Sequence, residues 1–584
     1  MALSISHLLS VFFTVQSVAA APAPAPNSKS SLHAYQRSSN THGAVASENA
    51  QCSQIGADFI QHGGNAVDAM IGTIFCVGVI GMYHSGIGGG GFGVVRATNG
   101  SYDFFDFRET APGAAFQDMY NTNVNLSLYG GLASGVPGEL RGTEYLHQKY
   151  GKLSWESLLE PSIKLARNGF TVGQDLVNYM ASATEGQENF LVNNPTWAID
   201  FAPNGTLLKL GDTITRQRYA STLETIAKNG ADAFYEGPIA EATINAVQAA
   251  NGTMTVEDLK NYSVAVRKPA EIEYRGYKLA AGSAPSGGSV TLATMKIIEG
   301  YPTIGEEAYL NLSTHRLDES MRFAYGMRTE LGDPYFVPGM QQYEDSMISA
   351  KTAAEVRSKI SDAHTLNVSA YDPSGLESLE TPGTSHIVTA DSSGLAVSLT
   401  TTINLLFGSQ VMIPETGVIM NDEMNDFSIP GSSNAFGYIP SPANYIRPGK
   451  RPLSSMSPTI VSFPNGSLYA ALGAAGGSRI ITSTIQNLWH VLDQNMTMAE
   501  ALAMPRLHDQ LEPNQVNFEY PILQDGKEMF GYDNATVAYM AAKGHNVTWI
   551  APGQSTAQGL RRLGNSTFEA AGEPRQLDSG GITV

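Results

Sequence analysis

The sequence has few cysteines and few basic residues, and no long apolar run occurs beyond its first 21 residues. Two cysteines in 584 residues exclude a disulfide-rich scaffold and a cysteine-based metal centre, and the 12 histidines form no evident ligand cluster. The 35 basic residues against 54 acidic ones give a net charge of −19. This charge argues against nucleic acids and anionic membranes as partners. We therefore expect no metal, no nucleic acid and no stable membrane span.

The first 32 residues differ in composition from the rest of the chain. Residues 8–21 form a short apolar run that ends in small residues, and residues 22–32 are rich in Ala, Pro and Ser. This pattern predicts a signal peptide over residues 1–21 and a disordered segment over residues 22–32. An uncleaved anchor is the alternative, although the run is short for a membrane span.

Asn-X-Ser/Thr sequons are spread along the chain, which favours glycosylation and export. We expect an extracellular or cell-surface location, with a vacuolar or lytic compartment as the alternative. The sequons begin at Asn99, Asn125, Asn204, Asn251, Asn261, Asn311, Asn367, Asn465, Asn495, Asn534, Asn546 and Asn565.

The two cysteines lie in two predicted helices, over residues 48–61 and 66–79, that a short turn joins. Cys52 comes eleven residues before Gly63, and Cys76 comes eleven after Asn65. These positions are level in an antiparallel helix pair, so a disulfide is geometrically possible and fits an exported protein. Two buried free thiols are the alternative.

The chain is too long for one ordinary core, yet no long linker is visible. We expect a single large α/β body or two interlocked halves. Residues 86–93 form a glycine-rich turn without phosphate-loop spacing, which predicts close backbone packing. Residues 140–360 are predicted to be mostly helical. Residues 351–381 are expected to form a surface excursion, and residues 417–421 a strand.

Thr384 follows a Pro-Gly pair and begins a predicted β-hairpin that turns at residues 391–394. The run at 395–400 alternates between large apolar and small residues, which is typical of a half-buried strand. If the turn is centred between residues 392 and 393, Thr384 lies opposite Thr401 or Thr402. Two threonines would then share one edge of a sheet.

Several short motifs occur in a fixed order after the first forty or so residues. They are residues 63–69, 86–92, 107–112 (Phe-Arg-Glu-Thr-Ala-Pro), 135–138, 384–386 (Thr-Ser-His), 402–409, 417–428, 447–458 and 473–478 (Gly-Ala-Ala-Gly-Gly-Ser). Each motif is weak alone, but together they span nearly the whole chain. In this combination the sequence resembles the γ-glutamyltransferase (γ-glutamyltranspeptidase) family.

The resemblance implies an α/β (α+β) fold of the N-terminal nucleophile hydrolase type, a four-layer αββα sandwich. It also implies self-cleavage between Gly383 and Thr384. The products would be a large chain over residues 33–383 and a small catalytic chain over residues 384–584, which remain together as a heterodimer. The α-amine of Thr384 would then serve as the catalytic base. His386 is the alternative base, because strand alternation places it on the same face as Thr384.

Catalytic and binding roles follow from the same resemblance. Thr384 is the expected nucleophile and Thr402 its hydrogen-bond partner, while the backbone N–H groups of Gly476 and Gly477 form the expected oxyanion hole. The expected substrate contacts are Arg108, Ser454 and Ser455 to the α-carboxylate, Glu423 and Asp426 to the α-ammonium, and also Thr402, Asn404 and Gly477. Residues 429–446 are a candidate lid, with Phe436 or Tyr438 at its tip.

The implied activity is the transfer of a γ-glutamyl group from glutathione or a γ-glutamyl amide, through an acyl-enzyme, to water or to an amino-acid or peptide amine. It requires no metal and no organic cofactor. One alternative is a related acylase of the cephalosporin type, against which the amino-acid clamp of Arg108, Asp426 and the serine pair argues. The other is an inactive glycosylated homologue, against which the intact Thr384 and Thr402 argue.

Overall fold

The computed structural model describes residues 40–376, 383–431, 439–524 and 526–584. These residues belong to one unit of the chain, which begins at Ser38. The expected signal peptide, the expected disordered segment and the proposed lid tip at Phe436 and Tyr438 lie outside the described residues.

Two large antiparallel sheets form the centre of the described structure. The first has the strand order β20 (Gly580–Thr583), β1 (Gly43–Ser47), β9 (Ser385–Asp391), β10 (Ala396–Thr402), β2 (Gly90–Arg96), β3 (Tyr102–Asp106) and β6 (Ala265–Arg267). The second has the order β19 (Phe568–Ala571), β18 (Thr556–Arg562), β12 (Leu468–Ala475), β11 (Thr459–Ser462), β8 (Tyr277–Ala281) and β7 (Ala270–Tyr274). Strands β9 and β10 of the first sheet pack against β12 of the second.

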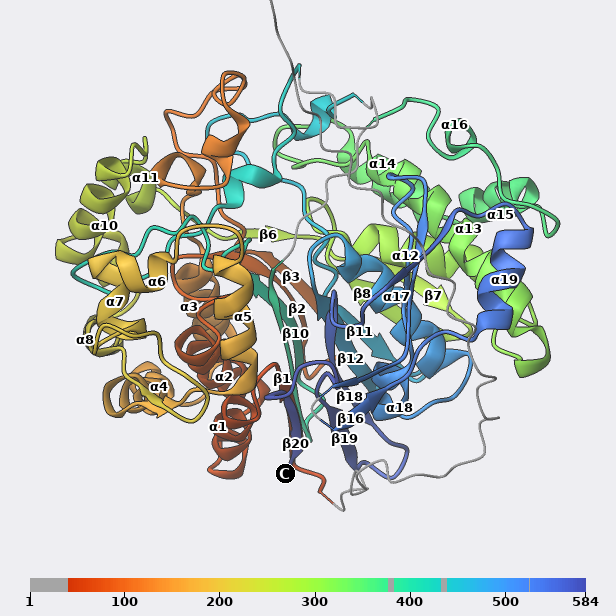
Figure 1. Ribbon diagram of the computed structural model, residues 1–584. Helices are drawn as coiled ribbons and strands as arrows, with labels where there is room; N and C mark the ends of the chain where they lie inside the picture. Colours follow the sequence, from red (N-terminus) through yellow and green to blue (C-terminus); the bar gives the residue numbers. More distant parts are fainter. Residues whose placement is uncertain (1–39, 377–382, 432–438, 525) are drawn as a thin grey trace, which may run out of the picture. The chain divides into compact units, whose positions relative to one another are not determined.

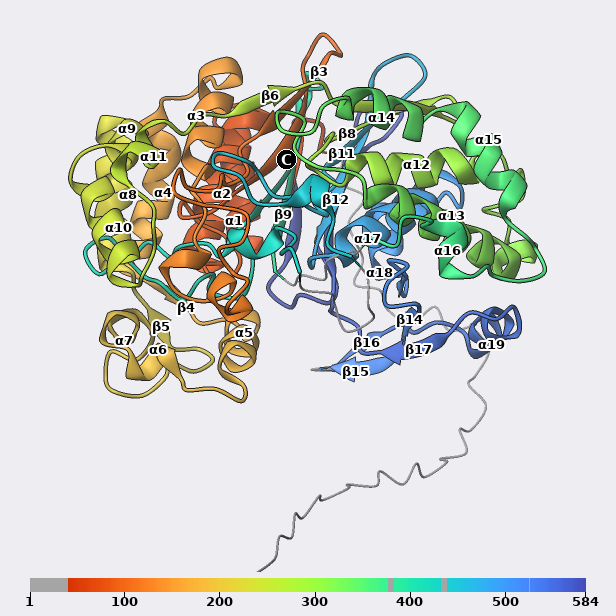
Figure 2. The ribbon, with the colours of Figure 1, turned by 90° about the horizontal axis from the view of Figure 1, so that it is seen from above.

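Helices cover the outer face of each sheet, which gives the expected four layers (Figures 1 and 2). Beside the first sheet lie α1 (Ala50–Gln61), α2 (Ala66–Ile80), α3 (Glu139–Tyr150), α4 (Trp155–Asn168), α8 (Gln217–Asn229) and α10 (Pro238–Ala249). Beside the second lie α12 (Gly288–Ile298), α13 (Leu310–Arg328) and α17 (Arg479–Leu492). The mixed α+β class predicted from the sequence is therefore confirmed.

Shorter elements complete the described structure. The helices are α5 (Gln174–Thr184), α6 (Phe190–Asn193), α7 (Pro195–Phe201), α9 (Asp232–Tyr235), α11 (Val256–Lys260), α14 (Met340–Met347), α15 (Ala350–Lys359), α16 (Val368–Tyr371), α18 (Met498–Ala503) and α19 (Asn534–Ala542). The strands are β4 (Phe170–Thr171), β5 (Thr213–Ile214), β13 (Leu507–His508), β14 (Val516–Glu519), β15 (Ile522–Gln524), β16 (Lys527–Met529) and β17 (Val547–Ile550).

Strand β9 is buried on both faces because it lies in the interior of the sandwich. Its neighbouring residues Ile387 and Val388 belong to two different apolar cores, one beneath the helices and one between the sheets. The partner strand β10 is also buried throughout, so the prediction of a half-buried strand is wrong. Its small side chains are needed because the second sheet packs closely there; Ser398, for example, donates to the Leu472 carbonyl at 3.1 Å.

Backbone packing explains the glycines at residues 86–93. A Cβ atom on Gly89 would lie 1.9 Å from the Thr402 carbonyl oxygen, and one on Gly91 would lie 2.0 Å from that of Thr400. The predicted close packing is therefore present. The predicted turn, however, extends only to Gly89, because strand β2 begins at Gly90.

The helix pair α1–α2 holds the predicted disulfide between Cys52 and Cys76. Asn65 caps α2 by accepting hydrogen bonds from the backbone N–H groups of Val67 and Asp68, as its position predicts. The Asp68 carboxylate accepts a hydrogen bond from the Asn65 backbone N–H at 2.9 Å, which completes a capping box. The bridge thus fastens two helices that cover the first sheet.

One local prediction is wrong. Residues 417–421 form no strand: Gly417 has a φ of +69°, and the segment makes one isolated bridge, between Met412 and Ile419. The expected surface excursion over residues 351–381 is mostly exposed or partly exposed where it is described, and it includes most of α15 and all of α16. Residues 377–382 lie outside the described residues.

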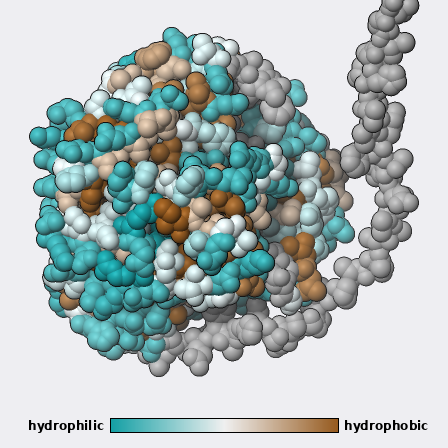
Figure 3. Space-filling view, turned by 60° about the vertical axis from the view of Figure 1, so that its left-hand side comes forward, coloured by the Kyte–Doolittle hydropathy of each residue, from teal (hydrophilic) through white to brown (hydrophobic). Residues whose placement is uncertain are grey.

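The surface carries most of the expected sequons. Eleven of the twelve asparagines are exposed, and Asn311, the exception, accepts a hydrogen bond from the Thr536 hydroxyl at 2.7 Å. The face in Figure 3 is mostly hydrophilic, with apolar residues in small separate groups. Every helix in the described part of the chain is too short or too polar to cross a bilayer.

Candidate active site

Thr384 lies directly before strand β9, in an unusual backbone conformation. Its φ is +95°, which few β-branched residues adopt, and the φ of Gly383 is +120°. A Cβ atom on Gly383 would lie 1.6 Å from the Asn404 carbonyl oxygen, so this position requires glycine. The peptide bond between Gly383 and Thr384 is therefore held in a strained segment against a fixed neighbour.

The hairpin brings Thr384 to Thr402, the last residue of β10. The register pairs Ser385 with Thr401, which places Thr384 beyond the last pair and next to Thr402. The Thr384 hydroxyl donates to Thr402 Oγ1 at 3.3 Å, and the Asn404 backbone N–H donates to the same atom at 2.8 Å. Thr402 is thus fixed from one side while it contacts Thr384 from the other.

The glycine-rich turn between β12 and α17 faces the Gly383 carbonyl. The Gly476 N–H donates to the Gly383 oxygen at 2.9 Å. Gly476 has a φ of +112°, and a Cβ atom there would lie 2.5 Å from the Gln554 carbonyl oxygen, so the turn depends on glycine. Gly477 follows with a φ of +58°. The hydrogen bond polarises the carbonyl of the bond that was expected to be cleaved.

His386 has other partners than Thr384. Its Nδ1 lies 2.8 Å from Thr400 Oγ1, and its Nε2 lies 3.3 Å from Ser398 Oγ. Burial between the sheets lowers the pKa of His386 to about 3. Because both ring nitrogens contact the hydroxyls of strand β10, the structure does not support His386 as the base for Thr384.

Arg108 lies at the centre of a buried acidic cluster. Its guanidinium bonds Glu423 through Nη1 and Asp426 through Nη2. Arg108 Nη2 also lies 3.4 Å from the Leu453 carbonyl oxygen. Arg108 Nε and Asp426 Oδ1 are buried without a hydrogen-bond partner among the described residues. Buried polar atoms of this kind require an explanation, and a bound polar ligand is one.

The carboxyl groups around Arg108 outnumber the positive charges. Burial raises the pKa of Glu423 and Asp426, and the Arg108 charge opposes this shift in both. Burial alone would lower the pKa of Arg108, but the charges of Glu423 and Asp426 outweigh it and raise that pKa. Burial also raises the pKa of Glu109 to about 8. The cluster is therefore suited to a ligand that carries a positive charge beside a negative one.

The serine pair borders this cluster. Ser455 Oγ accepts a hydrogen bond from Arg328 Nη2 at 3.1 Å, and Ser454 Oγ accepts one from the Met456 N–H at 3.2 Å. Asn444 bridges the neighbouring segments, since its Nδ2 donates to the Asp426 carbonyl at 2.7 Å and its Oδ1 accepts from the Leu453 N–H at 2.9 Å. The predicted α-carboxylate contacts are thus brought together.

Asp422 and Asn404 connect the threonine pair to the acidic cluster. Asn404 Nδ2 donates to the Asp422 carbonyl at 3.1 Å, and the Leu405 N–H donates to Asp422 Oδ1 at 2.9 Å. Asp422 directly precedes the 3-10 helix Glu423–Asp426. Hydrogen bonds from Thr384 to Asp422 and the peptide bond from Asp422 to Glu423 therefore connect the threonine pair to Arg108.

Sequence reasoning assigned no role to Glu109, Asp422 or Arg328, all three of which are buried in this cluster. Glu109 directly follows Arg108, and Asp422 directly precedes Glu423, in two of the motifs shared with the family. This adjacency could have identified both residues from the sequence. Arg328 lies at the end of helix α13 with no sequence neighbour in the site, so only the fold reveals it.

Solved structures define the class of this fold. The cephalosporin acylase of Bacillus halodurans superposes with a TM-score of 0.80 at 24% identity, covering 93% of this chain and 96% of that one. The Helicobacter pylori γ-glutamyltranspeptidase superposes with a TM-score of 0.51 at 33% identity, covering 55% of this chain and 92% of that one. The fold is that of the N-terminal nucleophile hydrolases.

Sequence comparison defines the family within this class. The family profile of gamma-glutamyltranspeptidase matches residues 52–582. A glutathione hydrolase proenzyme of Arthroderma benhamiae is 56% identical, covering 93% of each chain. A glutathione hydrolase of Aspergillus flavus is 50% identical, covering 93% of this chain and 89% of that one. The chain belongs to the gamma-glutamyltranspeptidase family and is an enzyme.

Proposed function

We propose that this enzyme cleaves itself before Thr384 and then uses Thr384 to transfer γ-glutamyl groups. The observation that carries the proposal is the threonine pair beside the Gly383 carbonyl, with the Gly476 N–H bonded to that carbonyl oxygen. Glutathione is the expected donor, as the names of the fungal relatives suggest. Water or an amino-acid or peptide amine is the expected acceptor.

Self-cleavage begins with attack of Thr384 Oγ1 on the Gly383 carbonyl carbon. The Gly476 N–H stabilises the negative charge that develops on the carbonyl oxygen. The bond from Gly383 to the Thr384 nitrogen then breaks, the nitrogen takes up a proton, and an ester forms at Oγ1. Water hydrolyses this ester, which releases the Gly383 carboxylate and leaves Thr384 with a free α-amine.

Turnover uses the same hydroxyl with a new base. A free α-amine titrates near pH 7.7–8.0, so a modest fall in its pKa supplies an unprotonated base at neutral pH. The amine accepts the Oγ1 proton as Oγ1 attacks the substrate γ-carbonyl, and the leaving amine departs with a proton. The acyl-enzyme then passes its γ-glutamyl group to water or to an acceptor amine, and Thr384 is regenerated.

Recognition of the γ-glutamyl group is assigned to the buried cluster. The substrate α-carboxylate would bind Arg108 and the pair Ser454 and Ser455, and the α-ammonium would bind Glu423 and Asp426. The partnerless atoms Arg108 Nε and Asp426 Oδ1 are available for these contacts. We also propose Asn404 and Gly477 as substrate contacts. The large and small chains produced by cleavage would remain together as a heterodimer.

A pair of chromogenic anilides tests this assignment. γ-Glutamyl and glutaryl p-nitroanilide differ only in the α-ammonium group, so an amino-acid clamp should prefer the first by roughly 10⁴-fold in kcat/KM. Asp426→Asn should narrow the preference, mainly by raising KM for the γ-glutamyl substrate. Thr384→Ala should reduce both rates by roughly 10⁴-fold or more. Equal rates on the two anilides would instead support an acylase without amino-acid specificity.

A further inference from the structure

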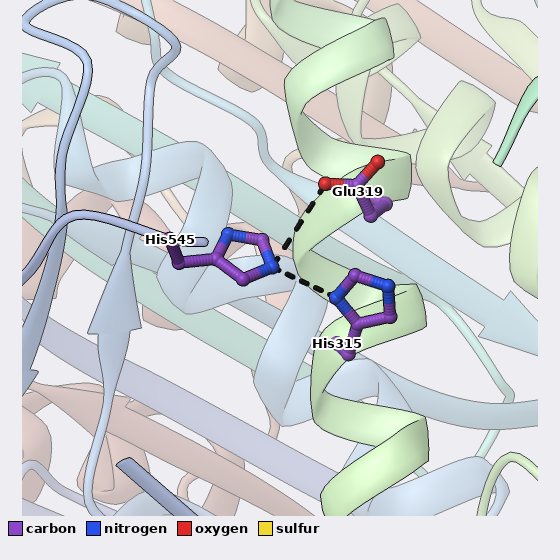
Figure 4. Close-up of side chains that lie close together, drawn as sticks. All are labelled: His315, Glu319 and His545. Carbon is purple, nitrogen blue, oxygen red and sulfur yellow. Dashed lines mark hydrogen bonds and ion pairs between the residues drawn. The ribbon is translucent and has the colours of Figure 1, made fainter. Parts of the chain in front are cut away.

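A second buried polar cluster lies on elements that the proposed active site does not use. His315, Asp318 and Glu319 belong to helix α13, and His545 lies between α19 and β17 (Figure 4). The side chains of Asp318, Glu319 and His545 are fully buried. His315 and His545 are 230 residues apart, which explains why the sequence predicts no ligand cluster.

The partners of His315 determine where its proton lies. Its Nε2 lies 2.8 Å from the Ser361 carbonyl oxygen. A carbonyl oxygen only accepts hydrogen bonds, so Nε2 carries the proton and Nδ1 of the neutral ring keeps its lone pair. That Nδ1 lies 2.8 Å from His545 Nε2, the two nitrogens that face each other in Figure 4.

The other ring nitrogen of His545 faces Asp318. Its Nδ1 lies 3.0 Å from Asp318 Oδ2, and neither atom has a partner with hydrogen-bond geometry among the described residues. With its proton on Nδ1, neutral His545 turns its Nε2 lone pair toward that of His315, and the two nitrogens can hold a cation between them. With its proton on Nε2, His545 instead donates to His315 Nδ1.

Glu319 supplies a third candidate ligand atom, a carboxylate oxygen close to the two facing nitrogens. Its Oε1 lies 3.9 Å from His545 Nε2, and all three candidate ligand atoms lie within 4.8 Å of one another. The Tyr371 hydroxyl donates to Glu319 at 2.7 and 2.8 Å. Two of the candidate ligands thus have an outer hydrogen-bond partner, the Ser361 carbonyl for His315 and the Tyr371 phenol for Glu319. Such partners orient the ligands in known metal sites.

We propose that His315 Nδ1, His545 Nε2 and a Glu319 carboxylate oxygen bind a divalent cation of the Zn²⁺ type. Two imidazoles and one carboxylate suit zinc better than calcium or magnesium, which prefer oxygen ligands. The carboxylates of Glu319 and Asp318 balance the two positive charges. Zinc–nitrogen distances of about 2.0–2.1 Å require the facing nitrogens to move apart by roughly half an ångström.

The site would join distant parts of the chain rather than take part in the reaction. Helix α13 precedes the proposed cleavage bond and His545 follows it, so the cation would link the large chain to the small one. This consequence rests on the proposed cleavage, whereas cation binding itself does not. Backbone contact supports the junction, since the Thr365 N–H donates to the Lys543 carbonyl at 2.9 Å.

Zinc binding to the full chain tests the proposal. The protein is treated with a chelator, dialysed, incubated with zinc chloride and passed through a desalting column. Elemental analysis should then find one zinc per wild-type chain, and zinc should raise the Tm. His545→Gln keeps an amide that can donate to His315 but removes a zinc ligand, so this variant should lose the stoichiometric zinc and the rise in Tm. Thr384→Ala should retain both, because its zinc site is intact whether or not cleavage occurs.

Two further variants distinguish a built site from adventitious binding. Asp318→Asn removes the carboxylate behind His545 and should weaken the zinc affinity roughly 10–100-fold. His490→Gln changes a buried histidine outside the cluster, whose Nδ1 contacts Gln494, and should leave zinc binding unchanged. The proposal is overturned if the wild type takes up no stoichiometric zinc, or if His545→Gln binds as much zinc as the wild type.

Discussion

The threonine region and the Arg108 region use different kinds of polar groups on different kinds of backbone. Thr384 and Thr402 are neutral, and the strand ladder between β9 and β10 fixes their positions. Arg108, Glu423 and Asp426 are ionisable and buried, and they lie on irregular segments or on a short 3-10 helix. The first region therefore depends on backbone geometry, and the second depends on charge balance.

This difference separates two contributions to catalysis. Changes at the threonine region should reduce kcat, because they alter groups that act on the reacting bond. Changes at the Arg108 region should mainly raise KM, because they alter groups that hold a distant part of the substrate. The three kinetic predictions below test that separation, beginning with the largest expected effect, and a fourth tests the charge balance around Arg108.

Among the variants compared below, Gly476→Ala should have the largest effect on kcat. The new Cβ would lie 2.5 Å from the Gln554 carbonyl oxygen, so the turn must shift and move its N–H away from Gly383. We expect a loss of about 10²–10³-fold in kcat and slower self-cleavage, measured by steady-state kinetics and by the rate of precursor loss. Gly466→Ala is the matched control: its φ is +82°, but no atom lies within 4 Å of the new Cβ, so kcat should be unchanged.

Arg108→Gln should raise KM and also destabilise the fold. Removal of the guanidinium leaves the carboxylates of Glu423 and Asp426 buried without their partner, which typically costs about 3–5 kcal/mol. The double variant Arg108→Gln with Glu423→Gln should recover part of the stability but not the substrate affinity. Denaturant unfolding and KM measurements on all variants check this. A fall in kcat with an unchanged KM would contradict the proposed separation.

Thr402→Val should have a smaller effect on kcat. It removes the oxygen that accepts from the Thr384 hydroxyl and the Asn404 N–H. Neutral hydrogen bonds contribute about 0.5–1.5 kcal/mol, so we expect a loss of roughly tenfold in kcat at an unchanged KM. Thr402→Ser keeps the hydroxyl and should retain most of the rate. Equal losses in the two variants would mean that shape, rather than the hydrogen bond, is what matters.

The pH dependence of stability should reveal the buried Glu109. Burial raises its pKa from 4.5 to about 8. The folded protein keeps this proton while the unfolded chain releases it, so the free energy of unfolding should fall as pH rises from about 4.5 to about 8. Glu109→Gln should make this decline shallower in a Tm series across that range. Glu241→Gln, at an exposed position, should leave the slope unchanged.

Local patterns predicted the parts of the structure that short-range interactions determine. The helix pair with Cys52 and Cys76 and the hairpin that places Thr384 beside Thr402 both follow from turn residues and periodicity. The alternation in β10 predicted a strand but not its burial on both faces, since a single strand does not reveal a second sheet packed against it.

Long-range contacts were not accessible from those patterns. Strand β1 pairs with β20 at the opposite end of the described chain, as in the pairing of Ala44 with Thr583. Arg328 reaches Ser455, and His315 reaches His545, only through the fold. The raised pKa of Glu109 could not be predicted for a different reason: it results from burial in the fold, which the residue type does not reveal.

The central claim is that Thr384 cuts the chain before itself and then performs the reaction. The most direct test compares wild type and Thr384→Ala after deglycosylation, on a denaturing gel and by intact mass, with N-terminal sequencing of the smaller product. We expect two wild-type chains, the smaller one beginning Thr-Ser-His and ending at Val584, and a single uncut chain in the variant. An uncut wild type that still releases γ-glutamyl groups would contradict the account, because Thr384 would then have no free α-amine.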